Sequence, residues 1–148
     1  MLIGFFIGVL LWISIIDIQK HIIPDKVLFL AVIVKIGHLL WEKGFYIQTV
    51  WNLCLDGLVL SIPLLILVVL MERLFDKELL GGGDIKLLFV TGIYLGWEKN
   101  LWALLFASII GIAIGMMMLK RKTKDQQADS YFPFGPAIAA GAMITMIA

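Results

Sequence analysis

The chain of 148 residues carries six long runs of apolar residues, separated by short polar stretches. Within each run the apolar residues are continuous rather than alternating, which is typical of membrane helices and not of the strands of a β-barrel. Only helices and closed barrels can cross lipid, because no water there can bind exposed backbone groups. We therefore expect an all-α fold, a polytopic membrane protein with about six transmembrane helices in one domain over residues 1–148. The expected spans are residues 2–16, 27–41, 51–71, 85–97, 101–119 and 134–148.

The composition excludes several classes of protein. Hydrophobic residues make up 61% of the chain and charged residues 16%, whereas about 25% of an ordinary soluble domain is charged. A chain this short cannot hide so much apolar surface in a water-soluble core, because small domains bury proportionally less of their surface. A disordered chain, a nucleic-acid-binding domain and an ordinary cytosolic enzyme are thereby excluded, and the lipid bilayer is the expected surrounding.

Basic residues are distributed unevenly between the loops that join the expected spans. Nine of the 12 lie in the first, third and fifth loops, and two lie in the second and fourth. Because Lys and Arg favour the cytoplasmic side of a membrane, the odd-numbered loops are predicted to be cytoplasmic and both termini outside. The nine residues are Lys20, Lys26, Arg73, Lys77, Lys86, Lys120, Arg121, Lys122 and Lys124.

Two acidic residues, Asp17 and Asp84, are expected at similar depth on the cytoplasmic side. The run before Asp17 is short for a membrane span, so we expect its helix to continue past Asp17 and to stop before Pro24. Asp84 follows three glycines where the fourth span begins. Intramembrane acids indicate function by default, and two facing carboxyl groups would share one proton, as in aspartic peptide hydrolysis. From the residues alone, a helix-end Asp17 with an N-capping Asp84, or a proton relay, explains the pattern as well.

Three motifs stand in a fixed order along the chain. Asp17 is followed after five residues by residues 23–25 (IPD), a glycine run ends in Asp84 within residues 81–87 (GGGDIKL), and residues 131–137 read YFPFGPA. Together they resemble the first aspartate motif, the GxGD motif and the Pro-Phe-Gly-Pro signature of the bacterial type IV prepilin leader peptidases, which are GxGD-class intramembrane aspartyl proteases. The resemblance covers nearly the whole chain, and all three motifs fall on the side predicted to be cytoplasmic.

The resemblance implies an aspartic endopeptidase that removes the basic leader from type IV prepilins or type II secretion pseudopilins, usually after a glycine. Asp17 and Asp84 would be catalytic and a bound water the nucleophile, at the cytoplasmic face of a bacterial inner membrane. The substrate would be another membrane-inserted chain, extended at the cut bond, to which the glycine loop could offer backbone groups. Matching positions that would bind substrate or support the site are Pro24, Asp25, Gly81, Gly83, Lys86, Pro133 and Gly135.

One feature departs from the family's pattern. Many members carry an N-terminal domain with two Cys-x-x-Cys pairs, which binds zinc and methylates the trimmed pilin. This chain has one cysteine, Cys54, and starts at the first expected helix. We therefore expect a peptidase-only form with no methyltransferase activity, no zinc or other metal, no S-adenosylmethionine and no other cofactor.

A non-enzymatic membrane subunit, or a small proton-coupled transporter that uses the same aspartates, is the alternative function. A transporter would more often show internal repeats with broken helices in corresponding halves, and the sequence shows no convincing repeat. The oligomeric state stays open. Small residues four positions apart predict close packing between helices within the chain, at Gly4/Gly8, Gly92/Gly96, Gly111/Gly115 and Ala137/Gly141.

Overall fold

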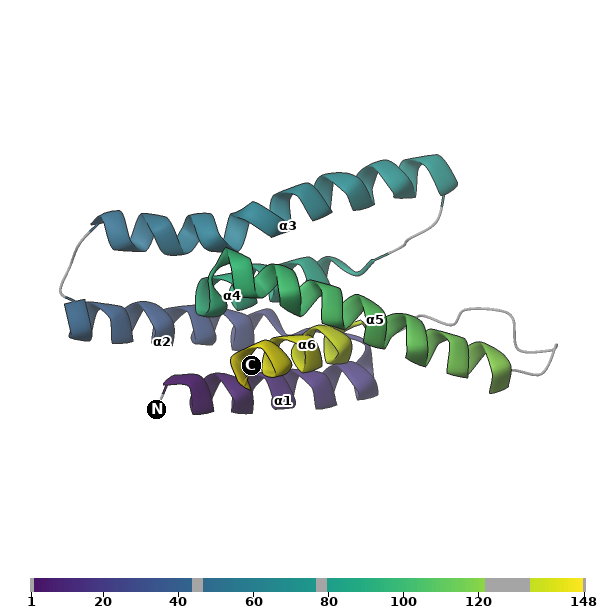
Figure 1. Ribbon diagram of the computed structural model, residues 1–148, viewed down its shortest axis with the longest axis horizontal. Coiled ribbons are helices and arrows are strands. Elements are labelled where there is room, and N and C mark those ends of the chain that lie inside the picture. Colours follow the sequence, from purple (N-terminus) through teal and green to yellow (C-terminus); the bar gives the residue numbers. More distant parts are fainter. Residues whose placement is uncertain (1, 44–46, 77–79, 122–133, 148) are drawn as a thin grey trace.

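The computed structural model describes residues 2–43, 47–76, 80–121 and 134–147, and the regular structure in them is entirely α-helical (Figure 1). The predicted all-α fold with six helices is confirmed, and each helix covers one of the apolar runs. The helices are α1 (Leu2–Lys20), α2 (Asp25–Lys43), α3 (Ile47–Phe75), α4 (Gly82–Leu95), α5 (Trp97–Arg121) and α6 (Gly135–Ile147).

The helices differ in how far they can reach across a bilayer. Among the described residues, three helices are long and apolar enough to cross a membrane: α1, α3 and the Trp97–Met117 part of α5. By contrast, α4 and α6 have 14 and 13 residues, about 20 Å at 1.5 Å per residue, against a hydrocarbon core of about 30 Å. Consecutive helices run in opposite directions, so both termini lie toward the same end of the bundle (Figure 1).

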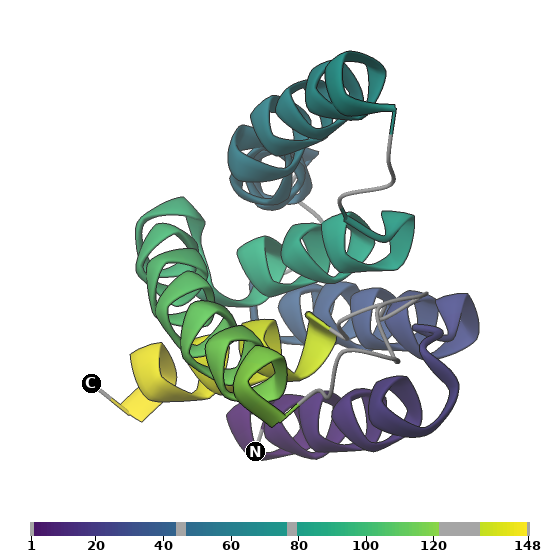
Figure 2. The ribbon, with the colours of Figure 1, turned by 90° about the vertical axis from the view of Figure 1, so that its right-hand side faces the viewer.

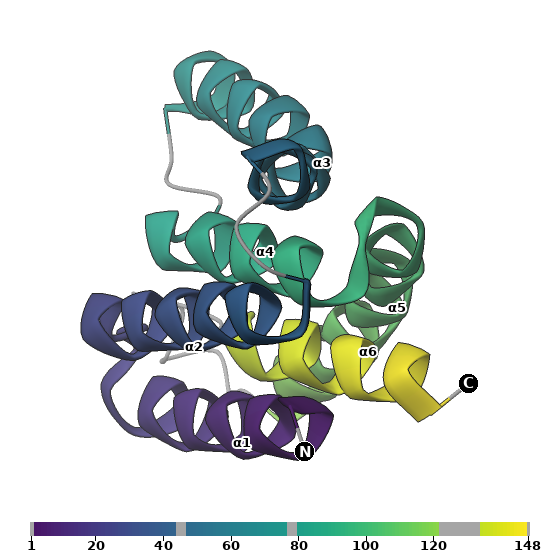
Figure 3. The same ribbon diagram turned by 90° about the vertical axis from the view of Figure 1, so that its left-hand side faces the viewer.

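The two short helices occupy the middle of the molecule. α6 packs against α1, α4 and α5, and α4 packs against α2, α3, α5 and α6 (Figure 3). The core between them is formed by large side chains that are fully buried, and lipid-facing positions on the longer helices remain exposed. The largest buried apolar side chains are Phe6, Leu10, Ile13, Leu87, Leu88 and Ile138.

Glycines bring particular helix pairs into backbone contact. A Cβ on Gly92 of α4 would lie 2.8 Å from the carbonyl oxygen of Asp56 in α3, and one on Gly141 of α6 would collide with the carbonyl oxygen of Ala103 in α5. The predicted close packing is therefore confirmed at Gly92 and Gly141. It is wrong for Gly4 and Gly8, where an added Cβ would meet nothing within 4 Å in the described chain.

The long helix α3 stands apart from the rest of the bundle over much of its length. It packs mainly on α4, and its C-terminal half diverges from the other helices (Figures 1 and 2). Pro63 lies inside α3, where proline removes one intrahelical hydrogen bond and bends a helix. The bundle therefore opens on either side of α4 beneath α3.

Tyr94 of α4 connects three helices. Its hydroxyl donates a hydrogen bond to the carbonyl oxygen of Ala31 in α2 at 2.7 Å. Its ring stacks on Phe6 of α1 with the ring centroids 3.7 Å apart, and the ammonium group of Lys35 in α2 lies 5.3 Å from the ring centroid. These contacts fix α1 and α2 relative to α4, which carries Asp84.

Candidate active site

Asp17 lies in the last turn of α1, and its residue is 3% exposed. The helix ends three residues later at Lys20, and His21 adopts a left-handed backbone conformation with φ of 52°. Its N–H still donates to the carbonyl oxygen of Asp17 at 2.8 Å. The expectation that the helix continues to the residue before Pro24 is therefore wrong: a left-handed residue ends a helix, and the residue before a proline disfavours helical angles.

Asp84 lies in the first turn of α4, after the glycine run. Gly81 is extended and caps the helix, and its carbonyl oxygen accepts the N–H of Asp84 at 3.0 Å. Asp84 is 4% exposed, although it carries a carboxyl group. The partial positive charge at a helix N-terminus favours an acidic side chain at this position.

The carboxyl groups of Asp17 and Asp84 line one cleft with a volume of about 310 Å³. They are close enough to interact electrostatically, and two acids in such proximity do not readily ionise together. Among the described residues, Oδ2 of Asp17 has no hydrogen-bond partner, so this oxygen is available to a proton, a water molecule or a substrate atom. The remaining lining residues are His21, Ile22, Ile23, Asp25, Gly81, Gly82, Gly83 and Lys86.

An ion pair joins two helix starts at the rim of this cleft. Nζ of Lys86 in α4 lies 2.8 Å and 2.9 Å from the two carboxylate oxygens of Asp25 in α2. Both side chains are exposed, so solvent weakens their attraction. Pro24 precedes Asp25, and its carbonyl oxygen accepts the N–H of Val27 at 3.0 Å. The pair and the proline thereby set where α2 begins beside the cleft.

The first turn of α6 closes the other side of the Asp17 carboxyl group. A Cβ on Gly135 would lie 2.6 Å from Oδ2 of Asp17, so only glycine lets α6 approach this closely. A Cβ on Gly83 would lie 3.0 Å from the Cβ of Ile23. Pro133, the remaining site residue predicted from the motifs, lies outside the described residues.

The fold thus brings the described members of the predicted set together. Asp17, Asp84, Asp25, Lys86, Gly81 and Gly83 line the cleft, and Pro24 and Gly135 adjoin it. The sequence interpretation missed His21, which also lines the cleft. Its position four residues after Asp17 was the available signal, because residues four apart lie on one helix face.

The fold and the cleft define a class: a helical membrane protein with two buried aspartates at one end of its bundle. The sequence matches the type IV leader peptidase family over residues 4–116. The chain belongs to this family. Its resemblance to the family, inferred from three motifs, is thereby confirmed.

Individual relatives agree with this placement. The chain is 28% identical over 138 residues to a prepilin leader peptidase/N-methyltransferase of Pseudomonas putida, covering 93% of this chain and 46% of the relative. It is 29% identical over 140 residues to the protein of that name from Aeromonas salmonicida strain A449, covering 94% and 46%. A Burkholderia pseudomallei relative of the same name is 36% identical over 77 residues, 52% of this chain and 24% of its own length.

The chain spans about half the length, or less, of the curated relatives it matches. No solved structure matches it.

Proposed function

We propose that this protein is an aspartic endopeptidase that removes the basic leader from a membrane-inserted type IV prepilin or pseudopilin. The observation that carries the proposal is the burial of Asp17 and Asp84, 67 positions apart in the sequence, on one cleft. Burying two acids is costly unless they are used. Membership of the type IV leader peptidase family supports the choice of substrate.

In the proposed reaction, the two carboxyl groups share one proton and hold a water molecule between them. The ionised carboxylate takes a proton from the water as its oxygen attacks the carbonyl carbon of the cut bond. The protonated carboxyl gives its proton to the carbonyl oxygen. The resulting diol loses a hydroxyl proton to the second carboxylate while the C–N bond breaks, and the amine nitrogen takes the proton from the first.

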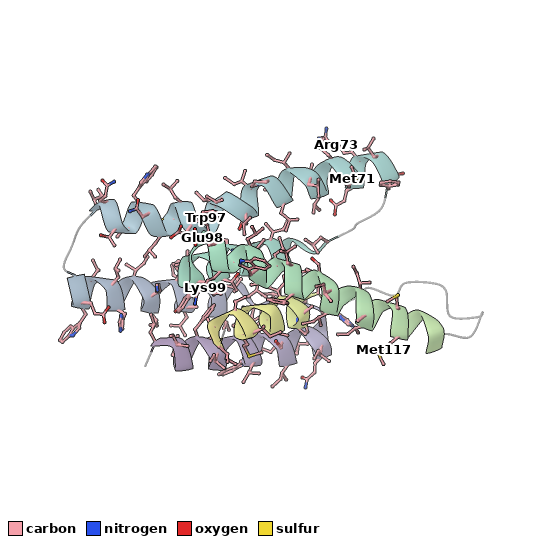
Figure 4. All side chains as sticks on the ribbon, in the orientation of Figure 1. Met71, Arg73, Trp97, Glu98, Lys99 and Met117 are labelled. Carbon is pink, nitrogen blue, oxygen red and sulfur yellow. The ribbon has the colours of Figure 1, made fainter. Side chains whose placement is uncertain are left out.

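We place the cleft at the cytoplasmic face of a bacterial inner membrane, with both termini outside. The start of α4 and the end of α3 lie at the cleft end of the bundle, and they carry Lys86 and Arg73. The turn from α4 to α5, with Trp97, Glu98 and Lys99, lies toward the other end (Figure 4). An excess of Lys and Arg at the cleft end supports this orientation.

The test is cleavage of a co-expressed type IV prepilin, followed by the mass loss of its leader. We expect Asp17→Asn and Asp84→Asn each to lower cleavage by about 10²–10⁴-fold, the range for a positioned acid or base. Asp76→Asn is the matched control, because Asp76 is exposed at the end of α3 and does not line the cleft. All variants must reach wild-type levels in the membrane.

Cleavage that survives either substitution would show that the pair was assigned wrongly, with Asp25 the next carboxyl to replace. No cleavage by the wild-type protein would contradict the peptidase proposal for this substrate class.

A further inference from the structure

Helices α2 and α3 both pack on α4, and the space between them forms an apolar groove (Figure 3). The groove has a volume of about 620 Å³. It extends along residues 25–32 of α2 and 58–65 of α3, roughly 10 Å of each helix at 1.5 Å per residue. Its walls are formed mainly by Phe29 and Val32 of α2, Ile62 and Leu65 of α3, and Ile85 and Phe89 of α4.

The groove is continuous with the aspartate cleft. Asp25 and Lys86, the ion pair at the rim, line both cavities. Along α4, the cleft is lined up to Asp84 and Lys86, and the groove continues from Ile85 to Val90. A chain with its cut bond in the cleft can therefore enter the groove within about one helical turn.

The groove walls are well exposed, although they are strongly apolar. Phe29 is 68% exposed and Leu65 is 45% exposed. In lipid such residues can face acyl chains, but a recess between two helices also accepts the ridge of side chains on a third helix. A segment inside the bilayer must itself be helical, since its backbone groups have no other partners there.

We propose that this groove binds the apolar membrane segment of the substrate, as a helix, on the C-terminal side of the cut bond. The proposal rests on the proposed peptidase function and names the surface that selects the substrate. The basic leader stays in the cytoplasm, the cut bond crosses the cleft in an extended form, and the apolar segment lies against α4 between α2 and α3. Recognition then depends on a helix of sufficient apolar length as well as on the residues beside the cut bond.

Photocrosslinking tests which molecule occupies the groove. A benzophenone amino acid replaces Phe29 or Leu65 in the full chain carrying Asp84→Asn, in membranes that contain a type IV prepilin. The matched controls are Leu30 on α2 and Leu70 on α3, which are exposed but do not line the groove. We expect prepilin adducts from both groove positions and not from the controls. Adducts with lipid alone, or with a second copy of this chain, would overturn the proposal.

Filling the groove gives a test by activity. Leu65→Trp and the control Leu70→Trp are compared on the intact prepilin and on a short peptide with the same leader and cut bond but no membrane segment. We expect the ratio of prepilin to peptide cleavage to fall about tenfold in Leu65→Trp, equivalent to about 1.4 kcal/mol of binding. The ratio in Leu70→Trp should match the wild type.

These measurements separate the two proposals. If the wild-type protein cleaves neither substrate, the peptidase proposal fails and the groove proposal fails with it. If the wild type cleaves the prepilin, and Leu65→Trp leaves the ratio unchanged, the groove proposal alone is overturned. Cleavage of the prepilin but not of the peptide by the wild type would support a required membrane segment.

Discussion

The Cα atom of Gly135 faces the carboxyl group of Asp17 so closely that a methyl group on it would lie 2.6 Å from Oδ2. The first turn of α6 is therefore part of the wall around a candidate catalytic oxygen. Gly135→Ala should displace this carboxyl group and lower prepilin cleavage by about 100-fold, the scale of a 1 Å misplacement in a catalytic site. The measurement is leader removal at matched membrane levels.

Gly115→Ala is the control for this substitution, because a Cβ at Gly115 would meet nothing within 4 Å. Equal cleavage by the Gly135→Ala and Gly115→Ala proteins would show that the contact with Asp17 is unimportant.

A second prediction concerns the contact between Gly83 and Ile23. A Cβ on Gly83 would lie 3.0 Å from the Cβ of Ile23, so Gly83→Val should push the glycine turn away from the segment that follows α1. We expect slower prepilin cleavage while the protein stays folded. Gly83→Ala should have a smaller effect, and the double variant Ile23→Ala/Gly83→Ala should recover activity because it removes the obstructing side chain. A double variant that is no better than Gly83→Ala would argue against this steric explanation.

A third prediction concerns the Asp25–Lys86 ion pair. Both side chains are exposed, and such pairs contribute about 0–1 kcal/mol to stability. Lys86→Met should therefore lower the free energy of unfolding by no more than about 1 kcal/mol, measured by denaturation in detergent at low salt. High salt should shrink the difference from wild type, because ions screen exposed charges. A larger, salt-independent loss would mean that Lys86 has a further structural contact.

The fourth prediction concerns a buried polar cluster between α4 and α5. Asn100 is fully buried; its Nδ2 donates to the carbonyl oxygen of Leu88 at 3.0 Å, and its Oδ1 lies 2.7 Å from Oγ1 of Thr91. Asn100→Leu should cost about 1–3 kcal/mol of unfolding free energy, because it leaves the partners of the amide group without it. The companion Asn100→Leu/Thr91→Val should be less destabilised than the sum of the two single variants. Additive losses would show that the two residues act independently.

The helices could be predicted from the sequence because each coincides with an apolar run, and their ends differ from the runs by a few residues. The aspartate pair could be predicted because Asp17 and Asp84 interrupt otherwise apolar surroundings. The end of α1 could not, since no residue pattern announced the left-handed conformation of His21.

The groove and the helix contacts were also beyond the sequence. In a membrane protein, residues that face lipid and residues that face the core are both apolar, so the pattern does not reveal which face packs. Phe6 is fully buried and Phe29 is exposed, although both lie in similar apolar runs. The position of Lys86 beside Asp25 depends in the same way on how α2 and α4 dock, which the local sequence does not encode.

The difference in helix length has a consequence for cellular safety. α3 and α5 have 29 and 25 residues, about 44 and 38 Å, and their ends project beyond the start of α4 (Figure 1). A folded domain of 100 residues has a radius of gyration of about 13 Å, so it is too wide to descend between them to Asp84. A flexible single strand is not. The recess therefore acts as a size filter: compact cytoplasmic proteins are protected from hydrolysis by their own bulk, whatever sequence they display.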